Sequence, residues 1–226
     1  MDALKKALFA FVDFVIPEEK RLQKLLTLNP EEMRKKLPRP RAIDVEEVTA
    51  LFDYRDKNVR LLVHALKYKG NLGVIKRLSL YLYEEIIEMV GEASLFEGIE
   101  GNQNVLIVPI PSSNKRKSER GWNQCELLCQ EIEKLETKEI KVRFDILKKI
   151  QNTEKQADLT REKRLKNVKG SMRVEKGKME RLKDGMKNNL FIIIDDVYTT
   201  GATYREARRA LKGAGAKKVT GVFIAH

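Results

Sequence analysis

Uninterrupted apolar runs mark the strands of this chain. Leu190–Ile194 and Val105–Val108 carry no polar residue, which is typical of strands buried on both faces of a parallel sheet. Val48–Tyr54 and Val219–Ala225 are candidates for further short strands, and Phe144–Leu147 is a weaker one. The pattern therefore predicts several strands distributed along the whole chain.

Apolar residues spaced three and four apart predict helices between these strands. Such stripes run from Val59 to Leu66, from Leu72 to Met89 with an end near Gly91, and from Ala207 to Ala214. Alternating strands and helices favour an α/β fold with a mainly parallel central sheet and helices on both faces.

Prolines divide the first part of the chain into short helices. Asn29 followed by Pro30 resembles a helix start with an Asn cap and Pro at the first position. Arg39–Arg41 reads as a linker. We therefore expect a helical N-terminal extension over 1–41 and a main domain over 42–226.

Length and charge narrow the class of protein. The 226 residues suffice for one sizeable domain with an appendage, and the net charge of +12 favours anionic partners such as nucleotides, polyphosphates or nucleic acid. The chain has no run of about 20 apolar residues, so we expect no membrane span. Asp13 interrupts the apolar run Leu8–Ile16, and no small-residue cleavage site follows, so we expect a cytoplasmic protein.

The two cysteines, Cys125 and Cys129, lie four residues apart on an expected helix. Two ligands cannot complete a structural zinc site, so no structural zinc is expected. Both side chains join the apolar stripe of Leu128 and Ile132, which favours buried packing over a disulfide in a cytoplasmic setting.

The main candidate site follows the strand Leu190–Ile194. Asp195 and Asp196 come first, then the turn Thr199–Thr203, then a helix. The N–H groups at a helix start favour a phosphate, Gly201 allows close backbone approach, and threonine hydroxyls add donors. The carboxylates suit neutral hydroxyls or a cation, so the stretch predicts a ribose 5-phosphate site.

Two other interpretations use similar residues. The metal-binding strand of a P-loop NTPase would need Gly-x-x-x-x-Gly-Lys-Ser/Thr upstream, and this chain has no such run. The second interpretation is that the stretch forms a structural turn that binds no ligand.

A second strand, Val105–Val108, is also followed by polar residues. Pro109–Ser113 ends it, and the cations Lys115, Arg116, Lys117 and Arg120 come next, before another helix. Such a cluster at the carboxyl edge of a sheet suits a pyrophosphate, because Arg can bind it through two parallel hydrogen bonds. Taken alone, it would read as a solvated basic loop.

The stretch Ile-Ile-Ile-Asp-Asp-Val-Tyr-Thr-Thr-Gly-Ala-Thr, 192–203, resembles the phosphoribosyl-pyrophosphate (PRPP) signature of type I phosphoribosyltransferases. The resemblance implies that the acidic pair holds the ribose hydroxyls as catalytic residues and that the loop cradles the 5-phosphate. The implied ribose and 5-phosphate residues are Asp195, Asp196, Val197, Tyr198, Thr199, Thr200, Gly201, Ala202 and Thr203. The implied pyrophosphate residues are Pro111, Ser112, Lys115, Arg116 and Arg120.

Further motifs resemble the ComF family, the competence protein F group, over roughly 50–226. They are Leu66-Lys67-Tyr68-Lys69-Gly70, Val108-Pro109-Ile110-Pro111, Arg120-Gly121-Trp122-Asn123-Gln124, and Thr153-x-x-Gln156-x-x-Leu159 with Arg164-x-x-Asn167-Val168. The chain departs from the family in lacking its N-terminal four-cysteine zinc ribbon, in carrying Lys149 in place of Arg, and in carrying Trp122 in place of Phe.

The resemblance implies an enzyme that binds PRPP with Mg²⁺, transfers the phosphoribosyl group to a nitrogen acceptor and releases pyrophosphate. Lys115, Arg116 and Arg120 would stabilise charge on the leaving group. The sequence indicates no pocket that would select a particular acceptor. The alternative is a non-catalytic PRPP-binding module of DNA uptake, associated with single-stranded DNA or a competence partner, with Trp122 and Tyr198 as stacking surfaces.

The polar segment from Lys149 to Val168 is long and weakly periodic. We expect it to form a mobile cover over the PRPP site, with a solvated loop as the alternative. The flexible-loop residues implied by the resemblance are Lys149, Thr153, Gln156, Arg164 and Asn167.

Overall fold

The computed structural model describes residues 18–41, 47–96, 104–135, 140–150, 168–175 and 189–226, without the side chains of 92–96 and 114–116. Its elements are, in chain order, α2 (Glu18–Leu26), α3 (Pro30–Lys36), β1 (Val48–Phe52), α4 (Lys57–His64), the π-helical turn η1 (Ala65–Lys69), α5 (Leu72–Phe96), β2 (Val105–Pro109), α6 (Asn114–Arg120), α7 (Gln124–Glu133), β3 (Ile140–Val142), β4 (Leu147–Lys149), β5 (Met172–Val174), β6 (Leu190–Val197), α9 (Ala202–Gly213) and β7 (Lys218–Ala225).

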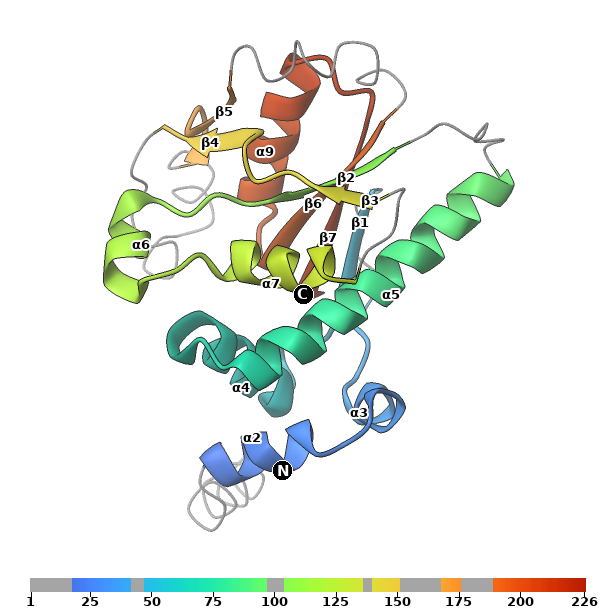
Figure 1. Cartoon of the computed structure of the whole chain (residues 1–226), viewed down its shortest axis with the longest axis vertical. Helices are drawn as coiled ribbons and strands as arrows, with labels where there is room; N and C mark the ends of the chain where they lie inside the picture. The colour runs from blue at the N-terminus through green and yellow to red at the C-terminus, as the bar shows by residue number, and fades with distance from the viewer. Residues whose placement is uncertain (1–17, 42–46, 97–103, 136–139, 151–167, 176–188) are drawn as a thin grey trace.

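Five strands form one parallel sheet in the order β1-β7-β6-β2-β3. The central strand β6 pairs with β2 on one side and with β7 on the other, and Ile194 is aligned with Pro109 and with Val222. Strands β4 and β5 form a separate antiparallel pair. The predicted α/β fold with a mainly parallel sheet is confirmed (Figure 1).

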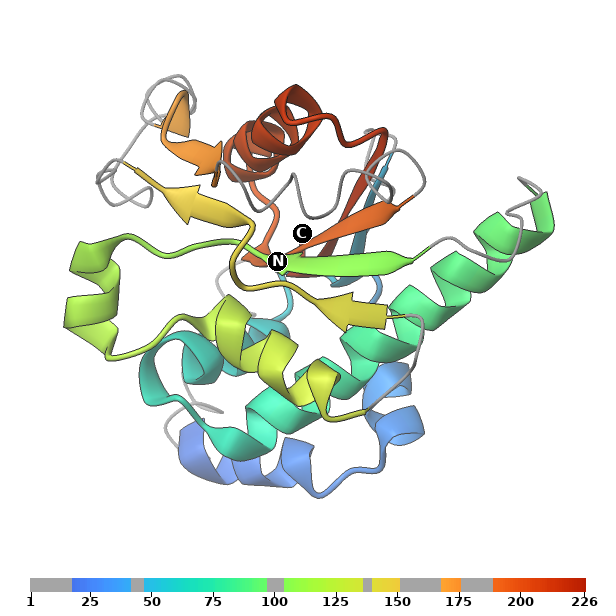
Figure 2. The same cartoon turned by 45° about the horizontal axis from the view of Figure 1, so that its top comes forward.

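Alternate residues of the central strands serve two different cores. Ile192 and Ile194 of β6 join the core that contains residues of α4, α5 and α7, whereas Phe191 and Ile193 join the core that contains residues of α9, β4 and β5. Figure 2 shows α9 on one side of the sheet and α5 with α7 on the other. Burial on both faces explains why these strands are apolar at every position.

The chain order reverses between β2 and β6. From β2 the chain passes through α6 and α7 to β3 at one edge, whereas from β6 it passes through α9 to β7 on the other side. In open α/β sheets, ligands bind at such a switch point, beyond the carboxyl ends of the strands. The topology therefore favours a site at the ends of β6 and β2.

The described part of the N-terminal region is helical and packs against the main core. Asn29 caps α3 in a capping box with Glu32, as the Asn-Pro pair predicted. Leu22, Leu25 and Met33 are buried in the core that α4 and α5 also share. The predicted domain boundary after residue 41 stays a prediction.

Three predicted elements were wrong in detail. The strand expected at Phe144–Leu147 is a turn followed by β4, because Arg143 pairs with Asp145 across that turn and the ladder to β5 begins only at Leu147. The helix expected to end near Gly91 continues to Phe96, since one glycine weakens a helix by only about 1 kcal/mol. The basic loop after Ser113 forms the short helix α6, consistent with the helix propensity of Lys, Arg and Glu.

Among the described residues, no helix combines the length and the apolar composition needed to cross a bilayer. The longest, α5, has 25 residues but carries Lys76, Arg77, Glu84, Glu85 and Glu88 along its length.

Candidate functional site

A cavity of about 320 Å³ lies beyond the carboxyl ends of β6 and β2. It is lined by residues from both predicted half-sites, and also by residues of η1, α6, α7 and β4. The lining residues are Lys67, Tyr68, Ile110, Pro111, Ser112, Glu119, Arg120, Asn123, Gln124, Cys125, Lys149, Asp195, Asp196, Val197, Thr199 and Thr203.

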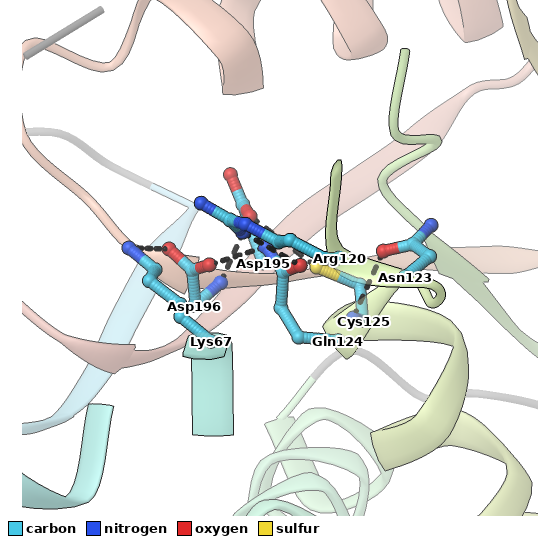
Figure 3. Close-up of polar contacts among 7 residues, drawn as sticks. All are labelled: Lys67, Arg120, Asn123, Gln124, Cys125, Asp195 and Asp196. Carbon is cyan, nitrogen blue, oxygen red and sulfur yellow. Dashed lines mark hydrogen bonds and ion pairs between the residues drawn. The ribbon is translucent and has the colours of Figure 1, made fainter. Parts of the chain in front are cut away.

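The carboxylate of Asp196 is held from two sides by protein donors. Lys67 Nζ lies 2.8 Å from Oδ1, and Gln124 Nε2 donates to Oδ2 over 2.6 Å. Asp196 is only 6% exposed. Figure 3 shows Lys67 reaching this carboxylate from η1 and Gln124 facing it from α7. Both oxygens are therefore occupied by contacts within the protein.

Asp195 is placed differently. Its Oδ1 accepts hydrogen bonds from the Asp196 backbone N–H at 2.9 Å and from Cys125 Sγ at 3.4 Å, whereas Oδ2 accepts none from any described residue. Burial, and after it the Asp196 carboxylate, raise the pKa of Asp195 from 3.8 to about 7, although the Asp196 N–H, Lys67 and the Cys125 thiol oppose the rise. Among the described residues, Asp195 is thus the member of the acidic pair with a carboxylate oxygen that accepts no hydrogen bond, in a setting that disfavours its charge.

The predicted 5-phosphate loop connects β6 to α9. Thr199 and Thr203 line the cavity, and Arg205 Nη2 donates to the Thr200 carbonyl at 2.6 Å. Gly201 precedes the first residue of α9 with φ of 71°. The loop therefore presents two hydroxyls and the beginning of a 12-residue helix toward the acidic pair.

Tyr198 does not face the cavity. It is 5% exposed and packs its ring edge-to-face against Tyr204, Phe223 and His226. The prediction that Tyr198 offers a stacking surface is therefore wrong, because its ring is packed in the core between the sheet and α9.

Tyr198 also explains why residue 201 is glycine. A Cβ at Gly201 would lie 2.3 Å from Tyr198 Oη. The buried tyrosine ring and the positive φ together restrict this position to glycine.

The predicted pyrophosphate residues are described in part. Pro111, Ser112 and Arg120 line the cavity, and Ser112 Oγ is buried without a hydrogen-bond partner in the described structure. The Arg120 guanidinium lies 4.7 Å from the centre of the Tyr68 ring and donates to Gln124 Oε1 over 3.3 Å. Lys115 and Arg116 belong to α6, but their side chains lie outside the description.

Of the predicted flexible-loop residues, Lys149 ends β4 and lines the cavity. Thr153, Gln156, Arg164 and Asn167 lie outside the described residues. The mobile cover stays a prediction.

Sequence reasoning missed the roles of Lys67, Gln124 and Cys125. The cysteines were correctly predicted to be buried, but the contact from the Cys125 thiol to Asp195 was not foreseen. Lys67 and Gln124 both lie in motifs quoted for the family resemblance, and that was the available signal. Asn123 of the same motif caps α7, where its Oδ1 accepts from the Cys125 N–H, and its Nδ2 donates to the Ile110 carbonyl.

Comparisons with known proteins identify relatives. No family model matches the chain. It is similar to "Competence protein F" of Haemophilus influenzae, with 25% identity over 161 residues, which cover 70% of this chain and 64% of the relative. "DNA utilization protein YhgH" of Escherichia coli O157:H7 is 27% identical over 161 residues, covering 70% of this chain and 63% of that protein. "Competence protein ComFC" of Bacillus subtilis is 31% identical over 127 residues, covering 54% and 45%.

The chain thus spans about 45 to 64% of the length of these relatives. The matches cover 54 to 70% of this chain, and the family motifs occur in order over roughly 50–226. The parallel sheet, with its acidic pair at the switch point, agrees with the fold that these motifs predict. The comparisons and the fold therefore support assignment of the chain to the ComF family.

Proposed function

We propose that this chain binds PRPP with Mg²⁺ in the cavity beyond β6 and β2 and transfers its phosphoribosyl group to a nitrogen acceptor. The observation that carries the proposal is one cavity lined by an acidic pair, by threonines at the start of α9, and by Ser112 and Arg120 after β2. A ligand with a ribose diol, a 5-phosphate and a pyrophosphate has three parts that match these three groups. The net charge of +12 favours such an anion.

Each part of the ligand has candidate partners. The N–H groups at the start of α9, with the hydroxyls of Thr199 and Thr203, would hold the 5-phosphate. The Oδ2 of Asp195, which accepts no hydrogen bond from a described residue, would accept one from a ribose hydroxyl. The Arg120 guanidinium and the Ser112 hydroxyl, for which the described structure gives no partner, would donate to the pyrophosphate.

The reaction breaks the bond from ribose C1 to the pyrophosphate oxygen and forms a bond from C1 to the acceptor nitrogen, which loses a proton. The carboxylates would hold the ribose in place, and Arg120 would stabilise negative charge on the departing pyrophosphate. The same Asp195 oxygen, without a partner in the described part of the chain, would also suit Mg²⁺, which prefers oxygen ligands and bound phosphates. When bound, the ion would neutralise part of the pyrophosphate charge.

A second candidate function follows from the names of the relatives, which refer to competence and to DNA utilization. In this alternative, the chain is a PRPP-binding module of DNA uptake that associates with single-stranded DNA or a competence partner and performs no transfer. The excess of cations supports it, because Lys and Arg neutralise phosphates along a strand. In either case we expect the protein to act in the cytoplasm.

Calorimetry with PRPP and Mg²⁺ tests the binding site. The Asp195→Asn, Asp196→Asn double variant should lose at least about 10-fold in affinity, which corresponds to about 1.4 kcal/mol. The matched control is Glu131→Gln, Glu133→Gln, which removes two charges near the far end of α7 and should bind as the wild type does. Equal affinities of wild type and site variant would contradict the assignment.

A turnover assay separates the two candidate functions. Isotope-labelled PRPP is incubated with a panel of nucleobases, and release of pyrophosphate that depends on one acceptor would support transfer. Binding of PRPP without turnover, together with single-stranded DNA binding that weakens steeply with salt, would support the module instead.

A further inference from the structure

Arg120 is held in the cavity by the face of an aromatic ring. Its guanidinium carbon lies 4.7 Å from the centre of the Tyr68 ring. Tyr68 belongs to the π-helical turn η1 between α4 and α5, and isolated π-helical turns occur frequently at functional sites. The tyrosine lines the same cavity and is 57% exposed. Its side chain therefore contributes more to the wall of the cavity than to the core of the fold.

Stacking on a ring holds a guanidinium without using its hydrogen-bond donors. The cation–π attraction acts on the face of the guanidinium plane, whereas the five N–H groups of arginine point outward within that plane. Among the described residues, Arg120 donates one hydrogen bond, from Nη1 to Gln124 Oε1 over 3.3 Å (Figure 3). The guanidinium is thus held in place, and its other donors can bind an anion through parallel hydrogen bonds.

The contact with Gln124 fixes the direction of the guanidinium within its plane. Gln124 is 7% exposed, and its Nε2 donates to Asp196 Oδ2 over 2.6 Å, so that its Oε1 is left to accept from Arg120. Tyr68 supplies a contact to the face of the guanidinium and Gln124 supplies a contact to its edge. Together the two contacts define the orientation of the Arg120 head group.

The segment that carries Arg120 is also supported by η1. The turn ends at Gly70, and a Cβ at this position would lie 3.1 Å from Cζ2 of Trp122. Trp122 follows Arg120 by two residues, so the indole and the guanidinium both contact the same turn. The ring of His64 lies 4.8 Å from the ring of Tyr68, measured between centroids, and limits the movement of the tyrosine.

We propose that Tyr68 is a positioning residue that orients Arg120 toward the pyrophosphate of the ligand. It acts through the guanidinium, which then loses less freedom when the anion binds. The choice of pyrophosphate rests on the function proposed above, whereas the stack of Arg120 on Tyr68 does not.

The first test needs no ligand and asks whether the stack exists in solution. Arginine is labelled with ¹⁵N, and the Nε–H signal of Arg120 is assigned from its absence in Arg120→Met. Protons above an aromatic ring are shifted upfield, so Tyr68→Leu should move this signal downfield, whereas Tyr68→Phe should keep it in place. An Arg120 signal at the same position in wild type and Tyr68→Leu would overturn the proposal.

The second test is calorimetry with inorganic pyrophosphate and Mg²⁺. Tyr68→Leu should bind about 3- to 5-fold more weakly than the wild type, which is the size expected from the loss of an exposed cation–π contact. Tyr68→Phe should recover most of this loss, because it keeps the ring. The matched control is Phe144→Leu, which removes a 39% exposed ring outside the cavity lining and should bind as the wild type does. Equal losses in Tyr68→Leu and Tyr68→Phe would contradict a role of the ring.

A double-variant cycle decides whether Tyr68 acts through Arg120. Arg120→Met should weaken pyrophosphate binding about 10-fold, and the addition of Tyr68→Leu should change the affinity by less than about 2-fold. If Tyr68→Leu costs as much in the Arg120→Met background as in the wild type, the tyrosine acts independently of the arginine and the proposal is wrong.

Ribose 5-phosphate with Mg²⁺ separates a lost orientation of Arg120 from general damage to the cavity. This ligand has no pyrophosphate, so Tyr68→Leu should weaken its binding less than the binding of pyrophosphate. Equal losses for both ligands would indicate a disturbed cavity and would also overturn the proposal. If the wild type binds neither PRPP nor pyrophosphate, the proposed function itself fails. Pyrophosphate binding by the wild type that is the same in Tyr68→Leu refutes only the role of Tyr68.

Discussion

Substitution of Gly201 by alanine tests the geometry of the loop between β6 and α9. The backbone at this position has φ of 71°, where an alanine costs about 1–2 kcal/mol. The new Cβ would also lie 2.3 Å from Tyr198 Oη and 2.7 Å from Tyr198 Cζ. Tyr198 is enclosed by Tyr204, Phe223 and His226, so relieving the overlap costs a further ~1–3 kcal/mol.

The matched control is Gly215→Ala. Gly215 has φ of 105°, and nothing lies within 4 Å of an added Cβ. It therefore meets a backbone cost of about 1–2 kcal/mol without the overlap. Gly201→Ala should be less stable than this control by ~1–3 kcal/mol, and each kcal/mol lowers Tm by about 2–4 °C in a chain of this size.

The assay is urea unfolding followed by the fluorescence of Trp122, the only tryptophan of the chain. Wild type and both variants should share one m value, so that a change in midpoint reports stability. Displacing Tyr198 or the loop should also weaken ribose 5-phosphate binding about 10-fold in Gly201→Ala, with no change in Gly215→Ala. If Gly201→Ala is as stable as Gly215→Ala, the overlap with Tyr198 plays no part and the reasoning is refuted.

Three further predictions concern other parts of the chain. Burial raises the pKa of the Cys125 and Cys129 thiols well above the usual value, so a thiol reagent at pH 8 should label both only after denaturation, and fast labelling of the folded protein would contradict this. Burial disfavours the ionised Glu206 carboxylate, but hydrogen bonds from Arg209 and the Met172 N–H outweigh burial and lower the pKa of Glu206. The ionised carboxylate therefore stabilises the fold above the pKa of Glu206 in the unfolded chain, and this stabilisation is lost as the pH falls through the lower pKa of the folded state. Glu206→Gln should therefore lower Tm at pH 7 and less so at pH 3, and an equal loss at both would speak against it. Purified protein should contain no stoichiometric zinc by elemental analysis, because the chain has only two cysteines.

The strands at the centre of the sheet were predictable because burial on both faces leaves a local trace. Leu190–Ile194 is apolar throughout, and β6 begins at Leu190 as expected. The strand continues through the acidic pair to Val197, since the ladder to β7 runs on to the pair Val197 and Ala225. That extension depends on a partner strand and has no sign in the local pattern.

Short strands whose partners lie far away in the sequence were harder to predict from the sequence. β4 has three residues, and Leu147 pairs with Val174 beyond a long intervening segment. Nothing near Phe144 indicates where that ladder begins. Pairing across the chain, rather than the composition of the strand, sets its limits.

The candidate site was predictable only where its residues follow one another. Asp195, Asp196 and Thr199–Thr203 could be interpreted together, because strand, turn and helix succeed one another directly. Lys67 comes from η1, and a lysine beside a helical stripe reads as a solvated cation until its partner is known. The different contacts of the two aspartates depend on Lys67, Gln124 and Cys125, which lie far from them in the sequence, so the local pattern could not separate the pair.

The position of β7 in the sheet has a consequence for synthesis on the ribosome. β7 lies between β1 and β6, although it follows both in the chain, and Val48 of β1 is aligned with Gly221. During translation, β1 therefore lacks its ladder partner until Lys218–Ala225 has left the exit tunnel. Until then, apolar surface of β1 and α5 stays exposed in the nascent chain. Exposed apolar surface and unpaired strand edges favour chaperone binding or misassembly.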